Sequence, residues 1–365
     1  MKKYKIAVIG ASGMVGRELL DLFEKRKFPV GDIEMFNSGK KPSRVKFRGK
    51  TYRCRKPDLK TLKRAEMVFF VSTNETARKY APALSKAGVW CIDDSSEFRM
   101  DKNTPLVIPE INSALINREN RLIAGPNCTL TPLAVGCFGV HKKYGIEEVR
   151  LSTYQAVSGA GRTAIEQMFE ELGYYLGKKR GRLKNRAFRH PIAFNLFPQV
   201  GDFGRDGVSG EEKKVELELK KIWNAPKIKI SVTAVRVPVV RVHSLSAWIK
   251  TRKPWTFREL EKTITATGGV KYFAKPEDYS TPLNTQKTFE VTVSRLRKTG
   301  IKNEFQVWLC GDNLYKGAAL NSVQIAEEIV KRRKAKDVKG EKHEKNSIAG
   351  GFCGPGRLRG GETRR

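Results

Sequence analysis

Residues 5–20, KIAVIGASGMVGRELL, decide the fold class. Their first part, KIAVIG, is short, apolar and β-branched and ends in a glycine, which is typical of a buried strand. Their second part opens a stretch with helical spacing, MVGRELLDLFEKR, whose apolar side chains fall on one side: Val15, Leu19, Leu20 and Phe23. A strand that leads directly into a helix is the first half of a βαβ unit, so the chain is predicted to begin with a parallel sheet.

The same alternation continues along the first third of the chain. Apolar runs at residues 66–71, 89–94 and 121–125 predict further strands, and TARKYAPALSKAG, residues 76–88, predicts a helix between two of them. Alternating strands and helices form a parallel sheet with crossover helices. The sequence therefore predicts an α/β fold that begins with a Rossmann-like nucleotide-binding domain over residues 1–127.

Beyond residue 150 the pattern changes. Longer strands with alternating apolar residues are predicted in four segments: 149–158, 228–240, 243–250 and 288–296. Such strands suit a mixed or antiparallel sheet with one wetter face, which predicts a second, α+β domain over residues 128–311. NSVQIAEEIVKRR, residues 321–333, predicts a helix with one apolar face, within a C-terminal segment of about 312–333.

The charge of the chain is its most unusual bulk property. The chain has 71 Lys and Arg against 38 Asp and Glu, a net charge of +33. Residues 331–365 hold 12 basic and 4 acidic residues, which leaves +25 on residues 1–330. Such a field attracts nucleic acid and other anions alike. No basic–aromatic platform accompanies it, so nucleic acid is not favoured as a partner, although the basic tail 334–365, predicted to be disordered, leaves it open.

Other bulk features narrow the class of protein. The chain has 365 residues, of which 39% are hydrophobic, and this is enough for two domains. No apolar run approaches the roughly 18 residues that span a bilayer, and Lys5 interrupts the one stretch that looks like a signal peptide. The six cysteines and four histidines are scattered without metal-ligand spacing, so no metal site is predicted. We expect a cytoplasmic protein.

Three glycines mark a candidate phosphate site. Gly10, Gly13 and Gly16 lie at GxxGxxG spacing between the first strand and the first helix. Glycines there let backbone amides approach a phosphate at the helix N-terminus, although a plain strand–helix turn would show the same residues. After the second strand no acid follows Glu34, and the basic residues Lys40, Lys41 and Arg44 take its place. A basic loop suits the 2′-phosphate of NADP; the alternative is a solvated loop.

Candidate catalytic residues lie at and after the predicted domain junction. Cys128, in GPNCTLTPL, is placed to be a nucleophile, although a buried structural thiol is the common alternative; Cys137 is predicted to lie in the core. His243 is a candidate base, with Arg236 seven residues before it. The capping box of Ser209 and Glu212 starts a helix, and Glu211 and Lys214 share one face of it.

Nine motifs in order resemble one family, the bacterial aspartate-semialdehyde dehydrogenases: GASGMVG, DDSSEFRM, PLVIPEIN, GPNCTLTPL, STYQAVSGAGR, HPIAFNLFPQ, EEKKVELELKKI, VRVPVVRVHS and GDNLYKGAALNSVQIAEE. The resemblance implies NADP-dependent, reversible reductive dephosphorylation of L-aspartyl-4-phosphate to L-aspartate 4-semialdehyde through a cysteine thioester, on the route to lysine, threonine and methionine. It also implies a catalytic and dimerisation domain, a C-terminal helix that returns to the first domain, and self-association as a dimer or tetramer.

The resemblance also implies roles for single residues. The implied catalytic residues are the nucleophile Cys128, the acid/base His243, the substrate-orienting Gln155 and the oxyanion partner Asn127. Arg236 and Glu211 would hold the substrate's α-carboxylate and α-ammonium, and Arg99 and Lys214 its phosphate. Implied cofactor contacts, beside Lys40, are Gly10, Ser12, Gly13, Met14, Val15, Ser158, Gly159 and Asn313.

The chain departs from the family pattern at several positions. Val242 stands before His243, where the family usually has glycine, and Asp94 stands where it usually has asparagine. The family's Ser-Arg-Ser signature after the second strand is missing. An alternative is another acyl-phosphate reductase, such as N-acetyl-γ-glutamyl-phosphate reductase, but an acetylated amine has no charge for Glu211 to pair with.

Overall fold

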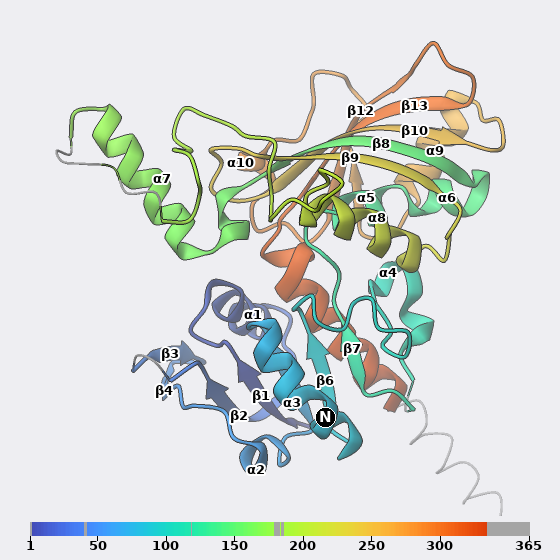
Figure 1. Cartoon of the computed structure of the whole chain (residues 1–365). Helices are drawn as coiled ribbons and strands as arrows, with labels where there is room; N and C mark the ends of the chain where they lie inside the picture. The colour runs from blue at the N-terminus through green and yellow to red at the C-terminus, as the bar shows by residue number, and fades with distance from the viewer. Residues whose placement is uncertain (1, 40–41, 118, 179–182, 184–185, 334–365) are drawn as a thin grey trace, which may run out of the picture.

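The computed structural model describes residues 2–39, 42–117, 119–178, 183 and 186–333. Two β-sheets lie one above the other, with helices between them (Figure 1). The predicted disordered tail, 334–365, lies outside the described residues. Among the described residues, no helix is both long and apolar enough to cross a bilayer.

The first sheet is parallel throughout and has the order β2-β1-β5-β6-β7. Its strands are β1 (Tyr4–Ile9), β2 (Val30–Phe36), β5 (Met67–Phe70), β6 (Trp90–Asp93) and β7 (Leu122–Ala124). Helices α1 (Met14–Lys25) and α3 (Asn74–Lys86) cover opposite faces of the sheet, each with its own apolar core. The sheet and both helices confirm the predicted Rossmann-like architecture.

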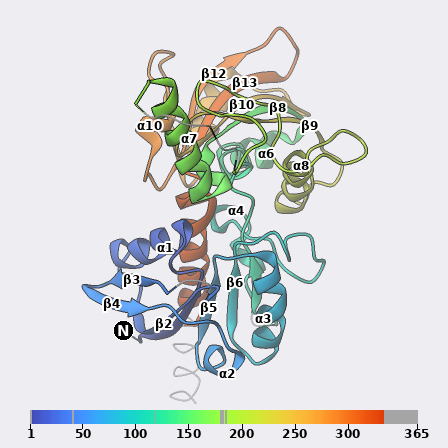
Figure 2. The same cartoon turned by 60° about the vertical axis from the view of Figure 1, so that its left-hand side comes forward.

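The last described helix, residues 320–333, packs against the first sheet although it follows the second one (Figure 2). Val323, Ala326 and Ile329 are buried in the same apolar core as α1. Arg26 at the end of α1 bonds Glu327 at 2.7 Å. The chain therefore returns to its first domain, as the family resemblance implied.

A small hairpin, which the sequence did not predict, lies beside β2. It consists of β3 (Arg44–Phe47) and β4 (Lys50–Arg53), and the short helix α2 (Leu59–Leu62) follows it. Just after β4, Arg55 pairs with Phe36 at the carboxyl end of β2. The hairpin thus brings basic residues of 53–56 to the edge where a Rossmann-like sheet binds its nucleotide.

The second sheet is mixed and has the order β11-β12-β13-β10-β8-β9. Its strands are β8 (Ile146–Gln155), β9 (Lys229–Arg236), β10 (His243–Thr251), β11 (Val270–Tyr272), β12 (Val291–Lys298) and β13 (Glu304–Gly311). The pairs β8–β9 and β11–β12 are parallel and the others antiparallel, which confirms the predicted mixed sheet. The predicted strand over 228–240 is too long: it ends at Arg236, and the carbonyls of Val239 and Val240 bond a separate turn.

Helices cover one face of the second sheet. An apolar core lies between that face and four helices: α5 (Thr131–Gly136), α6 (Phe138–Tyr144), α8 (Gly210–Ile222) and α9 (Phe257–Thr265). Helix α7 (Arg162–Tyr175) stands to one side (Figure 1). The remaining short elements are α4 (Pro109–Asn112), η1 (Ser113–Leu115), η2 (Val157–Ala160), α10 (Pro282–Thr285) and the π-helical turn η3 (Tyr315–Ala319).

The chain crosses between the two sheets twice, and the crossings touch. The first crossing follows β7, near the predicted boundary at residue 127, and the second follows β13 through η3. A Cβ atom placed on Gly317 would lie 2.7 Å from the Cβ of Cys128, so only glycine permits this contact. The candidate nucleophile therefore lies at the contact between the two crossings.

Candidate active site

Cys128 and His243 meet between the two sheets. Cys128 follows β7, and His243 is the buried first residue of β10. The Cys128 Sγ lies 3.5 Å from His243 Nε2. The turn at Cys128 is locked locally, because the Asn127 side-chain oxygen accepts the Thr129 amide at 2.7 Å and the Thr131 hydroxyl bonds the Asn127 carbonyl at 2.9 Å. The two residues that the sequence proposed as nucleophile and base are thus within contact distance.

A backbone amide fixes the tautomer of His243. The Ala156 N–H donates to His243 Nδ1 at 3.0 Å. Since Nδ1 accepts, the neutral ring carries its hydrogen on Nε2, the nitrogen that faces the sulfur. In this state His243 is a donor toward Cys128 and toward any oxygen that forms beside it.

Val242 adopts the conformation that glycine would favour. Its φ is +78°, which is uncommon for a β-branched residue and costs about 1–2 kcal/mol. The Asn313 Oδ1 accepts the Val242 amide at 2.9 Å, and the Asn313 amide bonds the Ser158 hydroxyl at 2.9 Å. These contacts hold the strained peptide in place, and the valine does not prevent His243 from reaching the sulfur.

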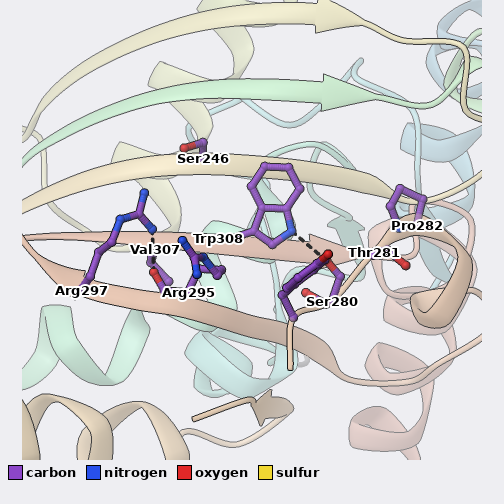
Figure 3. A pocket seen from close by; sticks show the side chains of 9 residues that line it. Ser246, Ser280, Thr281, Pro282, Arg295, Arg297, Val307 and Trp308 are labelled. Carbon is purple, nitrogen blue, oxygen red and sulfur yellow. Dashed lines mark hydrogen bonds between the residues drawn. The ribbon is translucent and has the colours of Figure 1, made fainter. Parts of the chain in front are cut away.

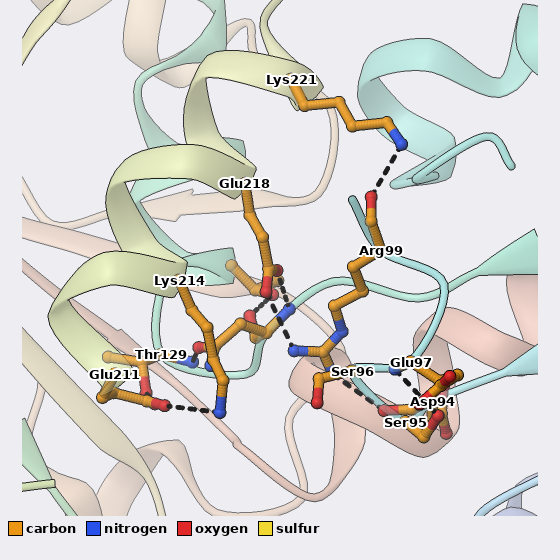
Figure 4. A network of polar contacts seen from close by, with 12 residues as sticks. Asp94, Ser95, Ser96, Glu97, Arg99, Thr129, Glu211, Lys214, Glu218 and Lys221 are labelled. Atoms are coloured by element: carbon orange, nitrogen blue, oxygen red, sulfur yellow. Dashed lines mark hydrogen bonds and ion pairs between the residues drawn. The ribbon is translucent and has the colours of Figure 1, made fainter. Parts of the chain in front are cut away.

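Glu211 contacts two candidate site residues, Gln155 and Lys214, and also Thr129. Its Oε1 accepts the Thr129 hydroxyl at 2.8 Å and the Gln155 side-chain amide at 3.1 Å. Its Oε2 lies 3.9 Å from Lys214 Nζ (Figure 4). The predicted capping box of Ser209 and Glu212 is present and starts α8 at the residue before Glu211. Helix capping thus places the carboxylate at the site.

Two buried arginines supply positive charge near the thiol. Arg236 donates from Nη1 to the Ala156 carbonyl at 2.7 Å, and Arg99 donates from Nη2 to the Asp94 carbonyl at 2.8 Å. The Nε of each arginine is buried and has no hydrogen-bond partner among the described residues. Buried donors of this kind normally find a partner, so both arginines are suited to bind anionic groups.

Electrostatics keep the resting thiol and imidazole neutral. Burial raises the pKa of the Cys128 thiol to about 11, and Glu211 adds to this, while Arg99 and Arg236 oppose it. Burial and the charge of Arg236 lower the pKa of His243 to about 3. A thiolate–imidazolium pair is therefore not the resting state.

Glu218 belongs to the site, although the sequence reasoning missed it. It is 1% exposed, pairs with Arg99 at 3.1 Å and accepts the Asn127 amide at 2.7 Å. The available signal was its spacing, because a residue seven positions after Glu211 lies on the same face of a helix. The sequence cannot show that the loop of Arg99 and the peptide of Asn127 lie against that face.

The cofactor residues that the resemblance implied form two groups. The first group lies around α1. Gly10 has a φ of +96°, and the backbone carbonyl of Ser12 accepts a hydrogen bond from the Arg17 side chain. Gly13 directly precedes the helix, whose first residues are Met14 and Val15. Near His243, Ser158 and Asn313 bond each other, and a Cβ on Gly159 would lie 3.3 Å from the imidazole. Lys40 lies outside the described residues.

Residues near the glycine turn fit a bound dinucleotide phosphate. A Cβ on Gly10 would lie 2.2 Å from the Val71 carbonyl, so only glycine lets the turn pass this close to the end of β5. The Ser72 hydroxyl beside it is buried without a partner among the described residues. Both features suit a phosphate at the N-terminus of α1.

Comparison with known proteins gives the family. The model of a semialdehyde dehydrogenase NAD binding domain matches residues 5–118, and that of a semialdehyde dehydrogenase dimerisation domain matches residues 137–316. Aspartate-semialdehyde dehydrogenases from Rickettsia bellii and Aquifex aeolicus are 38% and 36% identical, over 90% of this chain and 98% of theirs. This chain belongs to the aspartate-semialdehyde dehydrogenase family. Aspartate-semialdehyde dehydrogenase II from Vibrio cholerae, solved in complex with ASA, has a similar structure, with a TM-score of 0.86 and 32% sequence identity. The match covers 91% of this chain and 99% of that chain.

Asp94, which departs from the family pattern, is an unusual buried acid. The residue is partly buried, its Oδ1 accepts the Ser322 hydroxyl at 2.5 Å, and its Oδ2 is shielded from solvent and has no partner among the described residues. Burial raises the pKa of this carboxyl to about 7, the neighbouring Asp93 adds to the rise, and Ser322 and Arg99 oppose it. The folded protein therefore holds a proton on Asp94 that the unfolded chain releases near pH 4.

We predict that Asp94→Asn removes a pH dependence of stability. Because the native state binds the extra proton, the contribution of Asp94 is greatest below about pH 4 and declines as the pH rises toward about 7. The free energy of unfolding of Asp94→Asn should exceed that of the wild type by about 1–3 kcal/mol at pH 8, and the gain should shrink by pH 5. Urea unfolding at both pH values measures it; exposed Asp32→Asn is the control. An equal difference at both pH values would contradict the prediction.

Proposed function

We propose that this protein interconverts L-aspartyl-4-phosphate and L-aspartate 4-semialdehyde through a thioester on Cys128, with NADP as its cofactor. The contact that carries the proposal is the 3.5 Å approach of the Cys128 Sγ to His243 Nε2, with Glu211 and Arg236 beside it. One carboxylate and one guanidinium next to a thiol fit the ammonium and carboxylate of an amino-acid substrate. Family membership supports the same reaction.

The binding roles follow from the chemistry of each side chain. Glu211 binds the substrate's α-ammonium. An N-acetylated substrate is disfavoured, because its amide nitrogen has no charge to pair with the Glu211 carboxylate. Arg236 binds the substrate's α-carboxylate, because its buried Nε has no partner among the described residues and is available to donate. Arg99 and Lys214 bind the phosphate; they lie on opposite sides of the site, on the loop after β6 and on α8 (Figure 4). Gln155, bonded to Glu211, orients the substrate.

The reaction proceeds by acyl transfer to sulfur. As the Cys128 sulfur attacks the acyl carbon of aspartyl phosphate, a C–S bond forms and the C–O bond to phosphate breaks with its electron pair on the phosphate. The thiol proton passes to the departing phosphate. The nicotinamide of the bound cofactor supplies the hydride for the thioester carbon. The C–S bond of the resulting hemithioacetal then breaks, and the aldehyde leaves.

His243 and Asn127 act on the oxygen of the reacting carbonyl. His243 holds its hydrogen on Nε2 because Ala156 occupies Nδ1, so it can give a proton to this oxygen and take it back when the aldehyde forms. Removal of the thiol proton, the other role predicted from the sequence, requires the ring to lose this hydrogen first. The Cys128 amide and the Asn127 side chain are the proposed donors to the developing oxyanion.

We further propose a homodimer that forms through the second sheet. Helices cover one face of that sheet, and the matched family model is a dimerisation domain. On the other face, Trp308 donates from its indole nitrogen to the Ser280 carbonyl, beside Arg295 and Arg297 (Figure 3). Sedimentation velocity tests this: a monomer at micromolar concentration would contradict it.

The free thiols of the five described cysteines support a cytoplasmic location.

The activity is tested on two cysteines of the same segment. Cys128→Ala should reduce NADPH formation from L-aspartate 4-semialdehyde, NADP and phosphate by at least about 10³-fold, because Cys128 is the thiol that contacts His243 within the described part of the chain. Cys137→Ala is the matched control, since Cys137 is wholly buried in the core of the second sheet. Similar turnover in Cys128→Ala and the wild type would exclude Cys128 as the nucleophile, and no turnover in the wild type would exclude the proposed reaction.

The preference for NADP rests on the residues around the end of β2. A hollow of about 600 Å³ there is lined by Asn37, Ser38, Gly39, Pro42, Arg53, Cys54, Arg55 and Lys56. Glu34 pairs with Arg55, whose guanidinium also lies over the Phe36 ring. A cluster of cations favours a 2′-phosphate over a ribose hydroxyl. These cations come from the hairpin, which replaces the family's missing Ser-Arg-Ser signature.

Arg55→Ala tests the cofactor preference by binding alone. Loss of a charge-assisted contact should weaken NADP binding by roughly 10- to 100-fold and leave NAD binding within about twofold. Isothermal titration with each nucleotide measures both affinities, and Lys46→Ala, an exposed cation on β3 outside the hollow, is the control. If Arg55→Ala weakens NAD and NADP equally, Arg55 does not read the 2′-phosphate.

A further inference from the structure

Glu218 joins two parts of the site that come from different places in the chain. One carboxylate oxygen, Oε1, pairs with Arg99 Nη1 at 3.1 Å, and the other, Oε2, accepts the Asn127 amide at 2.7 Å. Arg99 lies on the loop after β6 of the first sheet, whereas Glu218 is on α8 of the second domain. The contact between Arg99 and Glu218 thus spans the two domains (Figure 4).

We propose that Glu218 is a positioning residue that holds the Arg99 guanidinium and the Asn127–Cys128 peptide at a fixed separation. This inference rests on the proposed function, in which Arg99 binds phosphate and Cys128 attacks the acyl carbon beside it. With both groups on one carboxylate, the phosphate site and the sulfur keep the spacing that acyl transfer to and from phosphate requires.

Burial shows why the pair serves geometry rather than stability. Glu218 is 1% exposed and Arg99 is 8% exposed. Removing both charges from water costs about as much as their attraction returns, so a buried pair adds little net stability, but its geometry is narrowly defined. Burial raises the pKa of Glu218, and the charge of Arg99 and the hydrogen bond from the Asn127 amide limit that rise.

A second residue of α8 holds the backbone of the same loop. The Lys221 ammonium donates to the carbonyls of Arg99, Asp101 and Thr104 at 2.7, 2.7 and 2.9 Å. The loop therefore remains attached to α8 when the carboxylate of Glu218 is replaced. Glu218→Gln should fold, and its effects should be confined to the Arg99 side chain and the Asn127 peptide.

Charge gives the proposal a signature that a purely structural role lacks. Arg99 lowers the pKa of the Cys128 thiol, and the negative charge of Glu218 beside Arg99 offsets this effect. Removal of that negative charge unmasks Arg99. The thiol of Glu218→Gln should therefore ionise at lower pH than that of the wild type.

The test compares Glu218→Gln with Glu216→Gln in the full chain. Glu216 is on the same helix and pairs only with Lys220, at 2.6 Å, among the described residues. For oxidation of the semialdehyde, we expect Glu218→Gln to raise the KM for inorganic phosphate and lower kcat, each roughly tenfold, with the semialdehyde KM within about threefold. Iodoacetamide alkylation of the Cys128 peptide, followed by mass spectrometry, should show its pH midpoint shifted to lower pH. Glu216→Gln should match the wild type in all of these.

Three results would overturn the proposal. The first is an unchanged phosphate KM and kcat in Glu218→Gln. The second is an equal rise of both KM values with an unmoved alkylation midpoint, which indicates a structural role only. The third applies if the wild type itself shows no turnover, which means that the proposed function fails. The alkylation midpoint of Glu218→Gln then decides alone. A shift to lower pH supports the role of Glu218, and no shift overturns it.

Discussion

The contact between Cys128 and Gly317 is the constraint on which the site depends. The chain passes from the first sheet to the second before Cys128 and returns through η3, and the two crossings meet where a Cβ on Gly317 would lie 2.7 Å from that of Cys128. Because both crossings belong to the packed domains, the backbone and Cβ of Cys128 cannot move toward Gly317 without shifting one of them. His243, at the start of β10, then lies 3.5 Å from the sulfur.

Charge balance around this fixed thiol follows from what each domain contributes. The first domain supplies Arg99 and the second supplies Glu211, Glu218 and Arg236. Burial and Glu211 keep the thiol protonated at rest, and the two arginines favour its ionisation. Substrate groups that neutralise Glu211 remove a negative charge that raises the pKa of the Cys128 thiol. A nucleophile that is unreactive at rest and activated by its own substrate is protected from irrelevant electrophiles.

The sequence predicted those features that depend on local pattern. Strand and helix periodicity gave both sheets, and the capping box gave the start of α8, because these signals lie within a few residues. Glu218 was missed because its partners, Arg99 and Asn127, are 119 and 91 residues away. Arg55 was missed because the hairpin that carries it to β2 has little periodicity. The strand ending at Arg236 was predicted too long, since apolar residues in the following turn continue its alternation. The position of His243 depends on strain at Val242, which Asn313 offsets from a distant segment.

The central claim is that Cys128 carries the acyl group. Mixing the wild type with L-aspartate 4-semialdehyde and NADP, without phosphate, should give a burst of about one NADPH per subunit and then slow turnover. Mass spectrometry of the quenched protein should place one aspartyl group, as a thioester, on the peptide that contains Cys128. A burst that leaves the acyl group on another residue, or steady NADPH formation with no covalent adduct, would contradict the account.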